Sequence, residues 1–161
     1  MFFTEKKLSR RTEELSQKRY IHVSSIAPFD AMEGKLSESE SNTFLPEFRK
    51  EGQLKLNDFF VGRDRYLWLE KTVTLPQNIE GCELIGFFDF GNTGSGTNSG
   101  FESMLYVNGR EYQGVDTNHQ EVFFTGLEGQ TVKLNFLLWT GLEGGGPHHE
   151  FYHRCKQADL L

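Results

Sequence analysis

The most chemically loaded stretch of the sequence is the segment 114–121. Within six residues it holds Asp116, Asn118, His119 and Glu121, which bring carboxylate, amide and imidazole groups together. Carboxylate, amide and imidazole groups at this density can hydrogen-bond the hydroxyl groups of a sugar or contact a neighbouring domain. The alternative is structural, because Asp and Asn side chains also stabilise turns by accepting hydrogen bonds from nearby backbone N–H groups. These four residues form the candidate site, with both interpretations open.

A second cluster, of metal-ligand type, lies near the C-terminus. His148, His149, Glu150 and His153 offer the imidazole and carboxylate groups that bind zinc and iron. On a strand, His149 and His153 would share one face, with His148 and Glu150 on the other. A cupin-type site needs His-x-His with a carboxylate on one strand and a further distant histidine, and this spacing is absent. We therefore expect a surface or interface cluster and no metal ion in this chain.

The sequence lacks the motifs of the common catalytic and phosphate sites. The glycine-rich segment 91–100 is expected between two strands, with no helix after it and no Gly-Lys-Ser/Thr, so it predicts a flexible loop. The hydrolase motif Gly-x-Ser-x-Gly does not occur. We therefore assign no catalytic residue to this chain.

Strand patterns are expected to position these segments. Residues 66–75 and 131–139 alternate between two faces with a period of two, and residues 83–90 are apolar on both faces, which is typical of a central strand. Asn108-Gly109 between two apolar strands predicts a hairpin with a type I′ turn. Seven or eight short strands with glycine-rich connections predict an all-β fold, an antiparallel β-sandwich of jelly-roll type.

One helix is expected before the sandwich. Residues 4–19 are rich in helix formers, and Thr4 can cap them. Only Leu8 and Leu15 share an apolar face, so this helix should dock weakly on something else. The expected organisation is a helix over residues 1–19 and a β-sandwich over residues 20–161.

Charge and composition exclude several classes of function. The net charge of −6 over 161 residues argues against a nucleic-acid partner. No apolar run approaches the roughly 18 residues of a membrane helix, so no membrane partner is expected. Two cysteines without a CxxC motif, and the absence of an Asn-x-Ser/Thr sequon, favour a cytoplasmic location.

Part of the chain resembles the N-terminal β-domain of glycoside hydrolase family 38 α-mannosidases. The resemblance covers about residues 60–125 and is carried by Tyr66–Pro76 (YLWLEKTVTLP), Gly81–Phe90 with its FDF strand, Ser99–Gly109 (SGFESMLYVNG) and Tyr112–Gly114 (YQG). It implies a galactose-binding-like β-sandwich that belongs to a longer enzyme hydrolysing the α-mannosidic bonds of glycans with retention.

In that family the catalytic machinery lies downstream, in a β/α domain that uses an Asp nucleophile and a divalent metal, zinc or calcium, held by a His-x-Asp motif. None of the five histidines here begins such a motif. The resemblance therefore implies a non-catalytic accessory domain without a cofactor of its own. Its partners would be the downstream catalytic domain and mannose-containing glycans, and a homo-oligomer remains open.

Two other interpretations compete with this one. The chain could be a stand-alone carbohydrate-binding module that stacks sugars on exposed aromatic side chains such as Trp68, Tyr112 or Trp139. It could also be a small cupin-like metalloenzyme built on the histidine cluster at residues 148–153.

Overall fold

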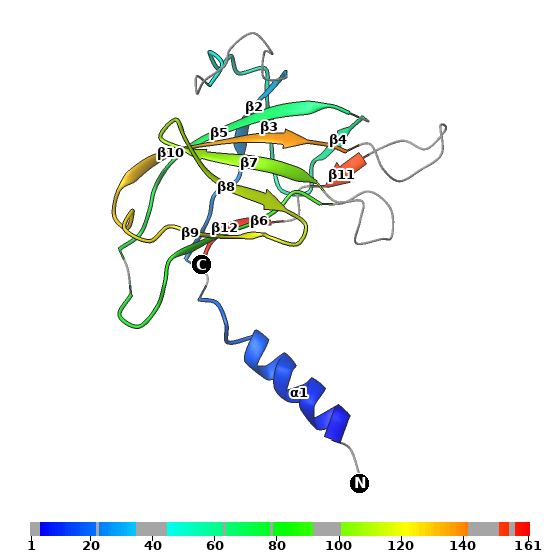
Figure 1. Cartoon of the computed structure of the whole chain (residues 1–161), viewed down its shortest axis with the longest axis vertical. Coiled ribbons are helices and arrows are strands. Elements are labelled where there is room, and N and C mark those ends of the chain that lie inside the picture. Colours follow the sequence, from blue (N-terminus) through cyan, green and yellow to red (C-terminus); the bar gives the residue numbers. More distant parts are fainter. Residues whose placement is uncertain are drawn as a thin grey trace.

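The structure is a computed structural model that describes residues 4–21, 23–34, 45–62, 64–77, 79–91, 101–141, 152–154 and 157–161. Over these residues the chain forms one helix, α1 (Thr4–Ser16), and twelve strands (Figure 1). The strands are β1 (Ser24–Ser25), β2 (Phe29–Glu33), β3 (Gly52–Leu54), β4 (Phe59–Val61), β5 (Tyr66–Thr74), β6 (Ile85–Asp89), β7 (Glu102–Val107), β8 (Arg110–Asp116), β9 (Glu121–Phe123), β10 (Thr131–Trp139), β11 (Tyr152–Arg154) and β12 (Gln157–Leu160).

Two antiparallel sheets form the sandwich, as the strand patterns predicted. The larger sheet has the order β3-β2-β5-β10-β7-β8, and the smaller has the order β1-β12-β6-β9. A short pair, β11 with β4, lies outside both. The long alternating strands β5 and β10 are neighbours at the middle of the larger sheet, and the doubly apolar β6 lies inside the smaller one.

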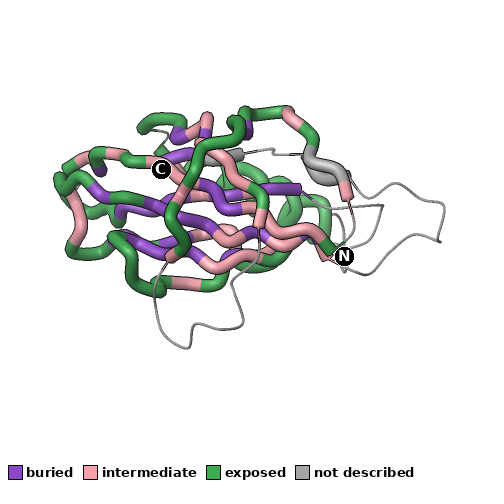
Figure 2. The backbone as a smooth tube through the Cα atoms, turned by 90° about the horizontal axis from the view of Figure 1, so that it is seen from above, coloured by how far each residue is buried: buried purple, intermediate pink, exposed green. Residues whose placement is uncertain are grey.

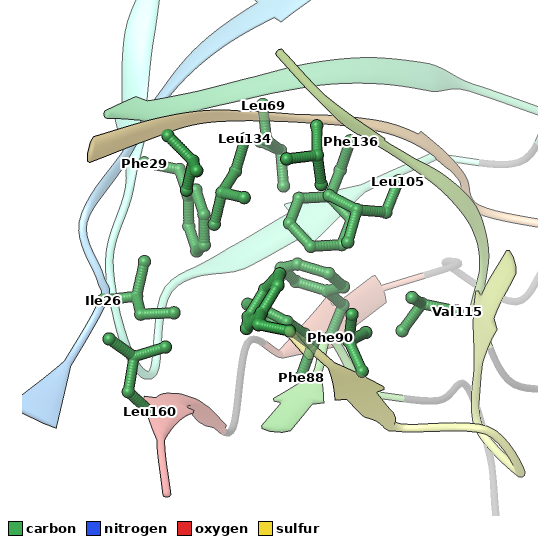
Figure 3. Close-up of a cluster of buried hydrophobic side chains, with 14 of the residues drawn as sticks. Ile26, Phe29, Leu69, Phe88, Phe90, Leu105, Val115, Leu134, Phe136 and Leu160 are labelled. Atoms are coloured by element: carbon green, nitrogen blue, oxygen red, sulfur yellow. The ribbon is translucent and has the colours of Figure 1, made fainter. Parts of the chain in front are cut away.

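The core fills the space between the two sheets. On β10, every second side chain is fully buried: Val132, Leu134, Phe136 and Leu138. Leu134 and Phe136 face Phe88 of β6 and Phe90 directly after it (Figure 3). The aromatic rings meet mostly edge to face, an arrangement that adds to the stabilisation from apolar burial. Figure 2 shows the buried positions running along the strands of both sheets.

The helix begins where it was expected and ends earlier. It ends at Ser16, three residues before the predicted end, and the N–H groups of Lys18 and Arg19 bond to carbonyls three residues back, so the α-helical pattern is not continued. The helix extends away from the sandwich (Figure 1) and has no buried residue. Leu8 and Leu15 are exposed, so the helix does not pack on the described part of the chain, and its weak docking on something else stays a prediction.

The hairpin at residues 108–109 has the predicted geometry. Asn108 and Gly109 have φ values of 51° and 79°, the left-handed pair that a type I′ turn requires, and β7 and β8 pair antiparallel on either side. The Asn108 side chain adds a contact that the sequence did not reveal, because its Oδ1 accepts a hydrogen bond from the Lys133 backbone N–H at 2.9 Å. The turn is thereby fixed to the neighbouring strand β10.

Substitutions in this turn should destabilise the fold. Asn108→Ala removes the hydrogen bond to β10 and should lower the free energy of unfolding by about 1 kcal/mol. Gly109→Val forces a β-branched residue to a positive φ and should cost about 1–3 kcal/mol. Gly114→Ala on the same hairpin is the control, since its φ is not positive and its added Cβ would meet only a backbone oxygen at 4.0 Å. Equal chemical denaturation midpoints for all three variants would contradict the turn assignment.

Candidate functional site

Asp116 organises the turn that carries the candidate site. This residue ends β8 and forms an isolated antiparallel bridge with His119. Its Oδ1 accepts hydrogen bonds from the backbone N–H groups of Asn118 at 2.7 Å and of His119 at 2.9 Å. Its Oδ2 lies 3.0 Å from His119 Nδ1. The carboxylate therefore makes the turn-stabilising bonds of the structural interpretation and also orients the imidazole.

The electrostatics of Asp116 follow from these contacts. Burial raises the pKa of its carboxyl, but hydrogen bonds from the His119 ring and from the two backbone N–H groups outweigh burial and hold the pKa below its usual range. The carboxylate therefore stays charged across the neutral range and fixes the Nδ1 side of the ring. The His119 side chain is 72% exposed, so its Nε2 edge is open to a ligand or a neighbouring protein surface.

Glu121 belongs to a different contact. Its carboxylate lies 2.7 Å from Arg19 Nη2 and accepts a hydrogen bond from the Tyr20 hydroxyl. Burial and the hydrogen bond to Glu121 raise the pKa of Tyr20 to about 12. We call Arg19, Tyr20 and Glu121 the N-terminal clasp, because they fasten the segment after α1 to β9. Among the described residues, no hydrogen bond or ion pair joins Glu121 to the Asp116–His119 pair.

A groove of about 540 Å³ runs beside the clasp. Arg19, Tyr20 and Glu121 form part of its wall. Four exposed apolar side chains also line it: Ile21, Val23, Ile79 and Phe123. Apolar side chains grouped in this way on a surface are typical of a surface that contacts another protein or domain.

The aromatic residues considered for sugar stacking differ sharply in exposure. Trp68 is only 1% exposed, so the expectation of an exposed indole at this position is wrong. Trp139 is half-buried, stacks on Tyr66 and donates its indole N–H to Asp64 at 2.9 Å. Tyr112 is exposed, and its hydroxyl donates to the Phe123 carbonyl.

A polar cavity that sequence reasoning missed lies on the outer face of the larger sheet. It has a volume of about 420 Å³ and is lined by Trp68, Glu70, Lys133 and Asn135 together with the segment 45–48. Strict alternation along β5 and β10 was the available signal, because these four side chains occupy the positions opposite the core-facing ones. The pattern predicted solvent-facing residues, but Trp68 and Asn135 are buried, and segment 45–48 lines the same cavity as they do.

Two candidate segments lie outside the described residues. These are the glycine-rich loop from residue 92 to residue 100 and the cluster His148, His149 and Glu150. For His153, only its backbone pairing with Phe60 is described. Among the residues that the structure does describe, no group of three or more His, Cys, Asp or Glu side chains could hold a metal ion.

No helix within the described residues is long and apolar enough to cross a membrane.

Comparison with known proteins leaves the family open. No model of a known protein family matches the chain, and no curated protein matches it either.

Proposed function

We propose that this chain is a non-catalytic accessory β-sandwich domain of a family 38 α-mannosidase. In this role it lies beside a downstream catalytic domain and forms one wall of the cleft that receives mannose-containing glycans. The family resemblance over residues 60–125 supports the proposal, and so does the sandwich fold. The zinc or calcium ion would belong to the catalytic domain, and the expected cellular location is the cytoplasm.

The observation that carries the proposal is the oriented, exposed imidazole of His119. An exposed side chain ordinarily samples several rotamers, and ordering it on binding costs free energy. The Asp116 carboxylate holds this ring at Nδ1 in the unbound chain. A histidine held in this way is suited to donate or accept one directional hydrogen bond from Nε2, to a sugar hydroxyl or to a group on the facing domain.

The apolar groove also supports the proposal, because a neighbouring domain would cover its exposed apolar side chains. The clasp residue Glu121 belongs to the same short strand, β9, as the exposed Phe123, and both line the groove. β9 begins two residues after His119, so the imidazole and the groove are close in sequence. A single docked domain could contact both.

Removal of the imidazole should affect catalysis far more than stability. In the full-length enzyme, His119→Ala should lower kcat/KM about tenfold, the effect of losing one hydrogen bond made in the transition state. In the chain alone, the same change should alter the free energy of unfolding by less than about 0.5 kcal/mol, because the ring is exposed. Steady-state kinetics on an aryl α-mannoside and urea denaturation measure the two effects.

Arg110→Ala is the matched control, since it changes an exposed residue at the other end of β8 and should leave kcat/KM unchanged. Equal losses of activity in the two variants would remove the special role of His119. Hydrolysis of the aryl mannoside by the chain alone, retained through repurification, would contradict a non-catalytic role. So would a reading frame that encodes no β/α domain with a His-x-Asp motif beyond codon 161.

A further inference from the structure

The outer face of the larger sheet holds two buried polar atoms without a partner. Trp68 Nε1 and Asn135 Oδ1 have no hydrogen-bond partner among the described residues. The side chains are 1% and 3% exposed, and both line the 420 Å³ cavity on this face. Buried polar groups are normally paired, and an unpaired one is unfavourable. Two of them lining one cavity indicate a site that a ligand completes.

Glu70 and Lys133, which also line the cavity, are paired with each other. Glu70 Oε2 accepts a hydrogen bond from Asn135 Nδ2 at 3.0 Å and lies 2.7 Å from Lys133 Nζ. These contacts hold the Asn135 amide in the orientation that leaves its oxygen free. The Glu70 carboxylate also compensates the charge of Lys133. The unpaired groups of the cavity are therefore one donor, the Trp68 indole N–H, and one acceptor, the Asn135 amide oxygen.

The segment 45–48, which we call the strap, lines the same cavity as Trp68 and Asn135. Its apolar members Leu45 and Phe48 are half-buried, and Pro46 lies between them in sequence. The fourth member, Glu47, lies 3.4 Å from Arg49 and is therefore also charge-compensated. Leu45 and Phe48 therefore line the same cavity as the two unpaired atoms and give it an apolar side.

We propose that this cavity binds a neutral polyhydroxylated molecule, of the size of one monosaccharide unit. A hydroxyl group can both accept the Trp68 indole N–H and donate to Asn135 Oδ1. The charged lining residues Glu47, Glu70 and Lys133 all have partners, so the cavity offers no free cation to an anion such as phosphate. The volume lies within the range of small-molecule sites, and the strap supplies an apolar cover for the C–H face of a sugar.

This site is independent of the proposed accessory role. It lies on the outer face of the larger sheet, and its lining shares no residue with the Asp116–His119 turn or the N-terminal clasp. A chain that fails to bind a sugar here could still support a catalytic domain through His119.

Nuclear magnetic resonance provides a direct test, because the chain has only two tryptophans. In the ¹⁵N-labelled protein, each indole N–H gives one signal, assigned with Trp68→Phe and Trp139→Phe. Methyl α-D-mannopyranoside, methyl α-D-glucopyranoside and glycerol are added in separate titrations. We expect at least one of them to shift the Trp68 signal saturably. The signal of the Trp139 indole N–H, which already donates a hydrogen bond to Asp64, should not shift and serves as the internal control.

The variants then test the assignment. Trp68→Phe should weaken binding about tenfold or more, since it removes the donor and keeps a ring in the site. Trp139→Phe should bind as the parent chain does. The proposal is overturned if none of the three polyols moves the Trp68 signal, and when neither indole signal moves this result needs no variant to fold. Equal movement of both indole signals, or a shift with inorganic phosphate in place of the polyols, would also overturn it.

Discussion

Replacing Phe136 with alanine should lower the free energy of unfolding by about 3–5 kcal/mol. Phe136 is fully buried at the centre of the larger sheet. Its ring meets those of Phe29, Phe88 and Phe90 edge to face, with centroid distances of 5.9, 4.8 and 5.2 Å. Alanine would leave a cavity between the two sheets and remove all three ring contacts, so the loss includes both apolar transfer and cavity terms.

Urea denaturation measures this loss, and Phe123→Ala is the matched control. Phe123 is an aromatic residue on β9 of the smaller sheet, but it is 46% exposed, so its removal should cost less than about 1 kcal/mol. If both variants unfold at the same urea concentration, the placement of Phe136 in the core is wrong.

Gly86→Ala should destabilise the chain by about 1–3 kcal/mol, although it adds a single methyl group. A Cβ atom at this position would lie 2.6 Å from the Phe88 ring and 2.8 Å from the Phe124 ring. Both rings are fully buried, so neither can move aside without disturbing its neighbours. Gly86 pairs with Val122 on one side and Leu160 on the other, so the strand itself is also confined.

Gly52→Ala separates this crowding from any general effect of losing a glycine. Gly52 also lies on a strand, β3, and a Cβ there would meet nothing within 4 Å. This control should be neutral or slightly stabilising, because alanine reduces the conformational entropy of the unfolded chain. A neutral Gly86→Ala variant would contradict the close packing of β6.

The strands that the sequence predicted are those whose local pattern agrees with their position in the sandwich. β5 and β10 alternate because only one face of the larger sheet packs on the core. β6 is apolar on both faces because Phe88 packs in the core, whereas Phe87 on the opposite face meets the ring of Tyr20 at a centroid distance of 6.0 Å. The 108–109 turn was predictable from two residues, since Asn-Gly favours positive φ at both positions.

The strands that the sequence missed are short and depend on distant partners. β2, with the sequence FDAME, shows no clear alternation and exists because Ala31 and its neighbours pair with β5 and β3. β3 is only three residues long, and neither β3 nor β12 was predicted. In these segments, hydrogen bonds to an already formed sheet outweigh weak local preference.

The contacts of the candidate residues are only partly local in sequence, and their role as a site stays a prediction. Asp116 and His119 do come together, because a turn between paired residues requires only local sequence. The clasp role of Glu121 depends on Arg19 and Tyr20, about one hundred positions earlier, and no local pattern reports such a contact. Trp68 was expected to be exposed because alternation along β5 identifies only the face of the sheet on which it lies. The alternation carries no information about the strap, which is distant in sequence and lines the same cavity.

The pairing of β1 with β12 bears on how fast the chain folds. Ser24 pairs with Leu160, so the smaller sheet cannot be completed until nearly the whole chain has been brought together. Closing so long a loop costs chain entropy before any contact compensates for it, and folds dominated by such distant pairings are slow to form. The hairpin β7–β8 and the neighbouring strand β10 can form early from nearby sequence, whereas the edge of β12 stays unpaired until late. During that interval the exposed edge is the part of the molecule most open to pairing with another chain.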